Sequence, residues 1–324
     1  MRTGPIAKVL LVRLDGLGDA IACAPLLLAL RNAGHTIGAA LSNRNAGIFA
    51  PGMLAAEHVL ERIPWPRHGS TRESTARAIA SIAVMRYDVA LIASEEPEAY
   101  RLAAGIGERV GFVTGWAKPI KTLWARSRVT RATFRRASLS DADGHEVETI
   151  YRLGGALVAD AAPSRDPRVL RTILQGAGVA PARHGIVLQL GTKWTALGVP
   201  PECVRAIATA LAPHGARAIA SPAEAAAARA LAGDAPLEVL PSLEAWKNAI
   251  DSAAVLVSPD TGAVHLAGML GVPVVAVFGA HRATAQIARW RPWASPGAAF
   301  TSDGLQRVDA SNRVAAAALA HLHG

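Results

Sequence analysis

The sequence predicts an α/β protein with two domains, each a mostly parallel sheet with helices on both faces. Strand and helix patterns alternate through the first half, and the alternation restarts after the Pro- and Ala-rich stretch 161–167. Each half also holds a glycine-containing turn between a strand and a helix, at 13–19 and at 258–266. The 324 residues, 51% of them hydrophobic, suffice for two cores. We place the domains at 1–165 and 166–324.

The elements of the first half follow from hydrophobic periodicity. The expected strands are Val9–Arg13, Ile37–Leu41, Val89–Ala93 and Arg109–Phe112, and the expected helices are Ala20–Asn32 and Glu73–Met85. Residues 114–139 show neither period, which predicts a long loop with short helical pieces. A helical pattern resumes over about 146–158.

The second half repeats this pattern. The expected strands are Ile186–Leu190, Ala216–Ala220, Leu237–Leu240, Ala253–Val257 and Val272–Phe278, and the expected helices are Pro201–Leu211, Ala223–Ala232, Leu243–Ile250 and Gly262–Leu270. A last helix, about 312–323, could pack back across the linker onto the N-terminal domain.

The net charge of +9 is concentrated in one segment. Its seven basic residues are Lys118, Lys121, Arg126, Arg128, Arg131, Arg135 and Arg136, with no acidic residue among them. The rest of the chain is nearly neutral, and Trp116, Trp124 and Phe134 lie among the basic residues. This pattern indicates an anionic partner at one place, the alternative being a solvated loop. Nucleic acid is not expected, because no recognition helix or stacking platform is evident.

Cysteine usage and hydropathy indicate a cytoplasmic protein. Cys23 and Cys203 lie far apart without metal-ligand or redox spacing, which fits a reducing compartment. The apolar run Val9–Val12 is interrupted by Arg13 and Asp15 before it reaches signal-peptide length. No stretch approaches the roughly 20 apolar residues that span a bilayer.

The turn Asp260-Thr261-Gly262 is the strongest local signal. Asp260 is the expected N-cap of the following helix, whose first N–H groups suit a phosphate. Gly262 would let a ligand approach the backbone closely. An ordinary capped turn is an equally good interpretation. His265, one turn later, could face the site or be a structural histidine.

The turn Asp15–Asp19 is not a dinucleotide fingerprint, because Ile21 stands at its third glycine and Ser42 at its acidic position. The turn puts Asp19 at a helix start above the carboxyl end of the sheet. A carboxylate there is often only a cap, but in a cleft it could act as a general base on a hydroxyl.

A third turn, at 189–194, follows the first strand of the second half. Thr192 and Lys193 could contact a diphosphate and neutralise charge on a leaving group. Glu224 could hydrogen-bond a ribose, or simply lie in the first turn of a helix. The chain has no Walker motif, no Gly-x-Ser-x-Gly elbow and no metal-ligand pattern, so no cofactor and no metal are expected.

Several motifs together resemble a known family. They are Arg13–Asp19 after the first strand, Arg109–Phe112 before a basic loop, His145–Glu148 after it, Ser258–Ala267, and Gly271–Gly279. In this order they resemble glycosyltransferase family 9, the ADP-heptose:lipopolysaccharide heptosyltransferases, over essentially the whole chain.

The resemblance implies a GT-B fold, two Rossmann-like domains facing across a cleft, with the acceptor in the N-terminal one and the sugar nucleotide in the C-terminal one. It implies inverting, metal-independent transfer of a heptose from ADP-heptose to an inner-core acceptor, at the cytoplasmic face of the inner membrane. Asp19 matches the catalytic base, Asp260, Thr261 and Gly262 match donor contacts, and Glu224 matches a ribose contact. We add Thr192, Lys193 and His265 to the donor site. The expected acceptor site comprises Arg13, Asp15, Gly18, Arg128, Arg131, Arg135 and His145.

The chain departs from the family pattern at the donor loop. The family usually has Lys-Arg-Trp-Pro where this chain has Leu197–Pro200, so the phosphate-binding lysine is absent unless Lys193 replaces it. Two alternatives therefore stay open: a family member with another nucleotide sugar or a non-lipid acceptor, and a catalytically silent binding protein. The sequence does not indicate the oligomeric state.

Overall fold

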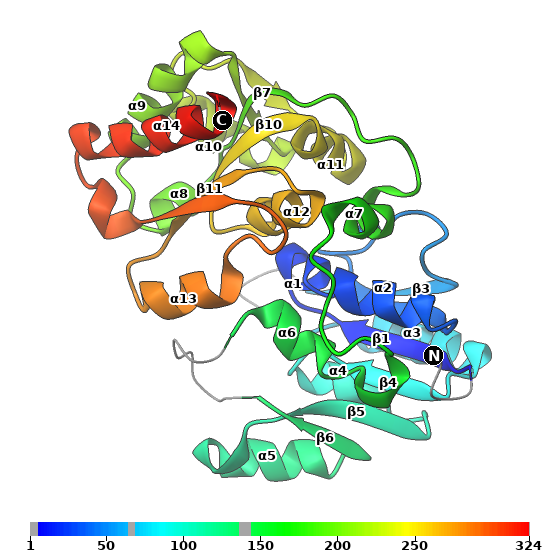
Figure 1. Cartoon of the computed structure of the whole chain (residues 1–324). Coiled ribbons are helices and arrows are strands. Elements are labelled where there is room, and N and C mark those ends of the chain that lie inside the picture. The colour runs from blue at the N-terminus through cyan, green and yellow to red at the C-terminus, as the bar shows by residue number, and fades with distance from the viewer. Residues whose placement is uncertain (1–5, 64–68, 136–143, 324) are drawn as a thin grey trace. The chain divides into compact units, whose positions relative to one another are not determined.

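The computed structural model describes residues 6–63, 69–135 and 144–323, which form two compact units (Figure 1). The N-terminal unit comprises the described residues up to Ser164 together with Thr172–Gly176. The C-terminal unit comprises Arg165–Arg171 and the described residues from Ala177 onward. The chain thus first passes from one unit to the other beside the expected boundary, and the helix α7 (Pro167–Gln175) spans the division.

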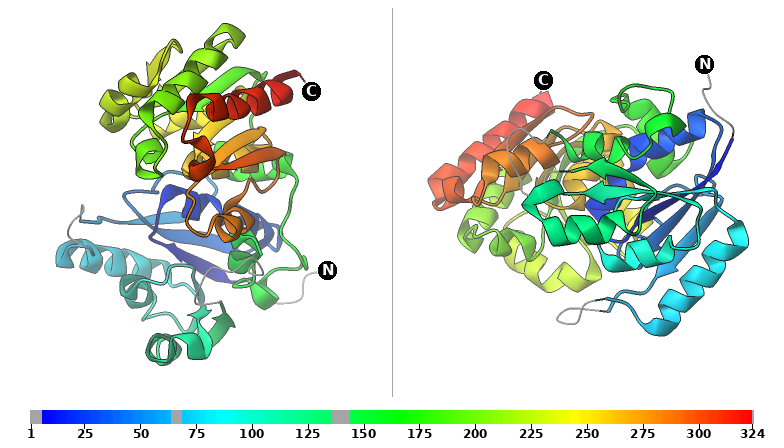
Figure 2. Two further views of the ribbon diagram at one scale, coloured as in Figure 1. Left: turned by 90° about the vertical axis from the view of Figure 1, so that its left-hand side faces the viewer. Right: turned by 90° about the horizontal axis from the view of Figure 1, so that it is seen from below.

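The N-terminal unit is a parallel six-stranded sheet with the order β3-β2-β1-β4-β5-β6. Its strands are β1 (Lys8–Arg13), β2 (Thr36–Ser42), β3 (Ala56–Leu60), β4 (Val89–Ile92), β5 (Glu108–Val113) and β6 (Arg131–Phe134). Its helices are α1 (Leu17–Ile21), α2 (Ala24–Asn32), α3 (Arg72–Met85), α4 (Pro97–Leu102), α5 (Pro119–Arg126) and α6 (Glu146–Tyr151), with 3-10 turns η1 (Gly115–Ala117) and η2 (Gly155–Leu157). Helices cover both faces of the sheet (Figure 2).

Two expectations for this unit are wrong. The single helix expected over Ala20–Asn32 is two helices, because Pro25 cannot donate a backbone hydrogen bond and α2 restarts there with Pro25 in its first turn. The basic segment is not mainly a loop: it contains α5 and the edge strand β6. All but one of the four residues of β6 are exposed, so the strand lacks the alternation that would have revealed it.

The C-terminal unit repeats the same topology. Its strands are β7 (His184–Gln189), β8 (Ala216–Ala220), β9 (Leu237–Val239), β10 (Ala253–Pro259), β11 (Val274–Phe278) and β12 (Gly297–Thr301), all parallel, in the order β12-β11-β10-β7-β8-β9. Its helices are α8 (Lys193–Ala196), α9 (Pro201–Leu211), α10 (Ala225–Leu231), α11 (Leu243–Asp251), α12 (Gly262–Leu270), α13 (Ala283–Trp290) and α14 (Val308–His323), with 3-10 turns η3 (Ala212–His214), η4 (Pro222–Glu224) and η5 (Ser302–Leu305).

The last helix belongs to the core of the C-terminal unit. Its residues Val314, Ala315 and Ala318 are buried in the same apolar cluster as Ile207 and Leu211 of α9. We had expected that this helix could pack across the linker. Within the C-terminal unit α14 covers the sheet beside α9, where its small buried side chains allow close packing. Packing onto the N-terminal domain stays a prediction.

Both sheets have one point where the strand order reverses, between β1 and β4 and between β7 and β10. In open α/β sheets, ligands bind beyond the carboxyl ends of the strands at such a point. The turns at 13–19, 189–194 and 258–262 follow β1, β7 and β10. All three turns that the sequence singles out therefore lie where this fold binds ligands. The two parallel sheets with helices on both faces are the doubly wound α/β architecture predicted from the sequence.

Candidate functional site

The C-terminal unit presents the start of α12 at the carboxyl end of β10. Thr261 is its N-cap: its backbone is extended, and its hydroxyl accepts from the backbone N–H of Ala263 at 3.3 Å. The predicted capping role of Asp260 is wrong, because the N–H of Asp260 still donates to Val277 O in register with the sheet. The N–H of Gly262 lies in the first turn, where a helix offers donors without an internal acceptor. The arrangement suits an anion.

His265 combines the two alternatives that the sequence left open. It is buried and its ring packs against Trp290, with 5.1 Å between centroids. Its Nε2 also lies 4.0 Å from Oδ1 of Asp260. The histidine is therefore a packed structural residue that lies directly beside the turn carrying Asp260.

Glu224 ties the loop after β7 to the turn after β8. One carboxylate oxygen accepts from the Thr192 N–H at 2.6 Å and the other from the Thr192 hydroxyl at 3.0 Å. A Cβ at position 191 would lie only 2.8 Å from this carboxylate, so Gly191 permits the contact. Thr192 and Glu224, both predicted at the donor site, are thus brought together by the fold.

Lys193 and Leu197 lie on and just after the short helix α8. Lys193 is its first residue and is exposed. Leu197 follows its end, and its Cδ2 would lie 3.4 Å from a Cβ on Gly279, next to the end of β11. An apolar side chain therefore occupies the sequence position where the family has its lysine.

Arg13 organises the site of the N-terminal unit. This buried side chain donates to Asp19 Oδ1 at 2.5 Å and lies 3.2 Å from Asp15 Oδ2. Burial alone would lower the pKa of Arg13, but the two carboxylates outweigh it and raise the pKa. Arg13 also donates to the backbone oxygen of Ala93 after β4. The guanidinium is therefore permanently charged and fixes both carboxylates at the switch point of the sheet.

Asp19 accepts a capping hydrogen bond at the start of α1, although it lies in the first turn of the helix and not at the N-cap position. It is the third residue of α1, and its Oδ2 accepts from the Gly16 N–H at 3.0 Å. Gly18 lies in the same turn, where its carbonyl accepts from Ala22 N. Both carboxylate oxygens of Asp19 thus have a donor, while part of the side chain stays exposed. That combination gives an oriented, accessible carboxylate.

Ser94 joins the loops after β1 and β4. Its hydroxyl donates to Asp15 Oδ2 at 2.5 Å and accepts from the Leu14 N–H at 2.7 Å. Asp15 is therefore held by Ser94 and Arg13 together. The sequence did not predict this role for Ser94, because a lone serine after a strand carries no recognisable pattern.

Glu146 is the main residue that the sequence analysis missed. It is the first residue of α6, is 0% exposed, and lies 3.2 Å from Arg135 Nη2 and 3.7 Å from Arg13 Nη2. Burial, partly offset by Arg135 and Arg13, raises its pKa to about 7. Its sequence neighbourhood indicates only an acidic first helical turn. Its position between two arginines became visible only in the fold.

Two of the seven basic residues point inward, toward Glu95. Lys121 and Arg135 both pair with this carboxylate, which follows β4. Burial opposes ionisation of Glu95, but the Lys121 hydrogen bond and the charge of Arg135 outweigh it, so its pKa is lowered. Arg135, predicted at the acceptor site, therefore belongs to the network around Arg13.

The other predicted acceptor residues lie apart from this network. Arg128 is exposed and stacks over the Trp124 ring at 4.4 Å, and Arg131 on β6 lies 3.3 Å from Glu108. His145 is buried and caps α6, its Nδ1 accepting from the Val147 N–H at 3.1 Å. Arg136 lies outside the described residues. An acceptor role for His145 stays a prediction, whereas its capping role is visible.

Within the described parts of the chain, no group of three or more His, Cys, Asp or Glu residues could hold a metal ion. The carboxylates of the N-terminal unit gather around Arg13 instead. The absence of a metal requirement remains a prediction.

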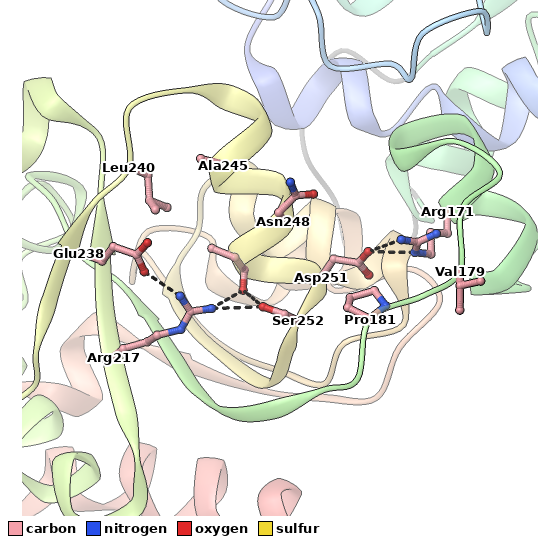
Figure 3. Close-up of a pocket in the computed structure, with 11 residues that line it drawn as sticks. Arg171, Val179, Pro181, Arg217, Glu238, Leu240, Ala245, Asn248, Asp251 and Ser252 are labelled. Carbon is pink, nitrogen blue, oxygen red and sulfur yellow. Dashed lines mark hydrogen bonds and ion pairs between the residues drawn. The ribbon is translucent and has the colours of Figure 1, made fainter.

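The C-terminal unit also has a pocket of about 460 Å³, far from these turns (Figure 3). Arg217 and Ser252, at the amino ends of β8 and β10, contribute to its lining, and Arg171 pairs there with Asp251 at 2.8 Å. The pocket therefore lies at the edge of the sheet opposite the carboxyl ends. We assign it no part in the donor site.

The model of glycosyltransferase family 9 (heptosyltransferase) matches residues 158–313. A search of curated proteins found no match.

Three solved structures share the fold. A glycosyltransferase family 9 protein from Veillonella parvula matches with a TM-score of 0.73 at 15% identity, covering 98% of this chain and 97% of its own. The E. coli heptosyltransferase WaaC, solved with ADP, matches with a TM-score of 0.68 at 21% identity, covering 94% of this chain and 97% of its own. E. coli ADP-heptose lps heptosyltransferase II matches with a TM-score of 0.69 at 15% identity, covering 98% of both chains.

These matches confirm the fold class predicted from the sequence, two Rossmann-like α/β halves of the GT-B type. The family model covers the turns after β7, β8 and β10, where Thr192, Glu224 and Thr261 lie. In the part of the chain that the structure describes, no helix is long and apolar enough to cross a membrane. The resemblance to glycosyltransferase family 9 is thus confirmed by the family model over residues 158–313, just under half of the chain, and the solved structures show that the whole chain shares the fold of heptosyltransferases.

Proposed function

We propose that this enzyme transfers a heptose from ADP-L-glycero-D-manno-heptose to a Kdo or heptose residue of a lipopolysaccharide inner core, with inversion and without a metal. The reaction would take place at the cytoplasmic face of the inner membrane. The observation that carries the proposal is the carboxylate of Asp19, oriented by Arg13 at the switch point of the N-terminal sheet. The family match supplies the reaction class.

Asp19 would act as the general base. Arg13 lies 2.5 Å from one carboxylate oxygen of Asp19, and the Gly16 N–H donates to the second, so the carboxylate is held in one orientation. A partly exposed carboxylate held in this way can take the proton of an acceptor hydroxyl as that oxygen attacks the anomeric carbon. Arg13 and Asp15 would orient the acceptor, with Gly18 leaving room beside the helix start.

The start of α12 would bind the departing diphosphate. The N–H of Gly262 and the positive end of the helix stabilise negative charge that develops on ADP. Asp260, beside this turn, would contact the donor sugar. On the other side of the switch point, Glu224 would exchange its bond to the Thr192 hydroxyl for a bond to the ribose.

Lys193 would neutralise the diphosphate in place of the family lysine. It is exposed and follows Thr192 directly, whereas Leu197 offers no charge. Its Nζ would act as a point charge on a flexible stem, which tolerates a shifted position in the sequence.

Calorimetric titration tests the donor. We expect ADP-heptose to bind more tightly than UDP- and GDP-linked sugars, and Lys193→Ala to weaken ADP-heptose binding about tenfold, or about 1.4 kcal/mol. Arg229→Ala, which removes an exposed charge on α10, is the matched control. Equal affinity for all nucleotide sugars, or no effect of Lys193→Ala, would contradict the assignment.

A second candidate is a family member with another nucleotide sugar, which Leu197 favours because it removes a phosphate contact. Tighter binding of a non-heptose donor in the same titration would select it. A silent binding protein with this fold would bind nucleotide without turnover.

A further inference from the structure

We propose that the N-terminal unit docks on an anionic lipid surface by inserting an apolar surface formed by Trp116 of η1 and by Ile120 and Leu123 of α5. We call these three residues the α5 face. The docking goes beyond the electrostatic attraction expected from the basic segment. The nature of the membrane rests on the proposed function, whereas the insertion itself rests on the geometry below.

The α5 face is strongly exposed. Trp116 in η1 is 90% exposed, Ile120 83% and Leu123 66%. Ile120 and Leu123, three residues apart on α5, lie on one side of that helix, and Trp116 lies in the 3-10 turn just before it. Large apolar side chains grouped in this way in water indicate an interaction surface.

The opposite side of α5 fixes the helix on the sheet. Ala125 is buried there, and Trp124, on the flank of the helix, packs edge-on against Tyr100 of α4, with 5.0 Å between ring centroids. The outward direction of the α5 face is therefore set by packing. Figure 1 shows α5 beside the edge strand β6 of this sheet.

Phe134 of β6 extends the apolar surface. It is more than half exposed, and its Cε2 would lie 3.0 Å from a Cβ on Gly115, the neighbour of Trp116. The glycine thus lets the Phe134 ring lie against the backbone next to Trp116.

The basic residues divide into two groups. Lys121 and Arg135 are held by Glu95, and Arg131 pairs with Glu108. Lys118 and Arg126, at the two ends of α5, are exposed, and neither forms a salt bridge with a described residue. Arg128 lies just beyond α5 and is also exposed. Lys118, Arg126 and Arg128 thus flank the α5 face with exposed charges that an external anionic partner can reach.

An anionic lipid surface is the occupant that fits both features. A helix with an apolar face between basic residues lies in the membrane interface, where Trp is favoured and Lys and Arg meet lipid phosphates. Single-stranded nucleic acid would need a groove with stacking aromatics. In the α5 face only Trp116 is aromatic, and Ile120 and Leu123 offer no stacking surface.

Vesicle co-sedimentation tests the insertion. We expect the purified protein to bind phosphatidylglycerol/phosphatidylethanolamine vesicles, and not phosphatidylcholine vesicles, in the absence of donor and acceptor. The triple variant Trp116→Ser, Ile120→Ser, Leu123→Ser should bind the anionic vesicles at least tenfold more weakly. Ile120→Ser alone should weaken binding severalfold. Val84→Ser, at a similarly exposed (79%) position on α3, should bind like the wild type.

A charge series completes the test. Lys118→Gln with Arg126→Gln should weaken binding and reduce its salt dependence, while Arg72→Gln with Arg229→Gln, the same charge change at other exposed positions, should have a smaller effect. Wild-type binding by the triple variant would overturn the proposal. Binding to RNA that depends on the same three residues, or equal binding to phosphatidylcholine, would overturn it as well.

Two variants separate the docking proposal from the proposed function. Ile120→Ser should keep full transfer to a lipid-free, water-soluble acceptor. Asp19→Asn should keep full vesicle binding. Loss of soluble-acceptor transfer in Ile120→Ser would mean that the α5 face serves the reaction directly, and would contradict a docking role.

Discussion

Arg13 holds together the most informative residues of the N-terminal unit. It lies on β1, yet it contacts Asp15 and Asp19 in the following turn and lies near Glu146 from α6. The sequence pointed to Asp15 and Asp19, because they flank a glycine turn after a strand. It could not point to Glu146, because that contact joins residues more than 130 positions apart. Charge pairs of this kind depend on topology and leave no local pattern.

Glu146→Gln should change the pH dependence of folding. The folded protein raises the pKa of Glu146 from its ordinary value of 4.5 to about 7. Between these values the native state therefore binds more protons than the unfolded state, and the wild type loses stability as the pH rises. Glutamine removes this dependence. Between the two pKa values, the free energy of unfolding of the variant should therefore rise relative to that of the wild type by at most about 3 kcal/mol as the pH increases.

Urea denaturation at about pH 5 and about pH 8 measures this difference. Glu148→Gln, which removes a partly buried carboxylate from the same turn, is the control. A Glu146→Gln variant that parallels the wild type at both pH values would show that Glu146 is ionised throughout, as a simple partner of Arg135.

At the scale of elements, the sequence predicted most accurately those helices that Gly or Pro delimits. Gly262–Leu270 and Pro201–Leu211 have the expected bounds, because Gly or Pro punctuates them and their apolar period is clear. The missed strands β3, β6 and β12 are edge or near-edge strands with exposed residues. The predicted N-cap of α12 was one residue too early, at Asp260 instead of Thr261. Asp and Thr are both good N-caps, and only the register of β10 decides between them.

Thr261→Ala should lower the free energy of unfolding by about 1 kcal/mol, because it removes the hydroxyl that accepts from Ala263 N. Thr261→Ser keeps this acceptor and should be nearly neutral. Asp260→Ala should not incur the capping loss. Chemical denaturation compares the three variants. A larger loss for Asp260→Ala than for Thr261→Ala would return the capping role to Asp260.

At the scale of the whole molecule, the chain uses one topology twice. Both sheets have the same strand order when counted from the first strand of their unit, and both put their glycine turns at the reversal. The alternation of patterns and the linker at 161–167 predicted this duplication. The pairing inside each unit, such as Glu224 with Thr192, depends on which loops the strand order makes neighbours, so it became visible only in three dimensions.

The proposed division of roles predicts that ADP, added without an acceptor, binds only the C-terminal unit. Hydrogen exchange should slow at 191–193 and 261–263 when ADP is added, because these backbone N–H groups would contact the nucleotide or lie beside it. The turn at 13–19 should exchange as before. Protection confined to 13–19 would assign the nucleotide to the N-terminal unit and contradict the proposed division of roles.

The most direct measurement of the central claim is transfer from ADP-heptose by the wild type and by Asp19→Asn. Asparagine keeps one oxygen that can still accept from Arg13, but its amide NH2 replaces the oxygen that accepts from the Gly16 N–H, and it cannot take a proton. We predict that the wild type glycosylates an inner-core acceptor, and that kcat falls about 10²- to 10⁴-fold in the variant while ADP binding is unchanged. Transfer by Asp19→Asn at the wild-type rate would contradict the account.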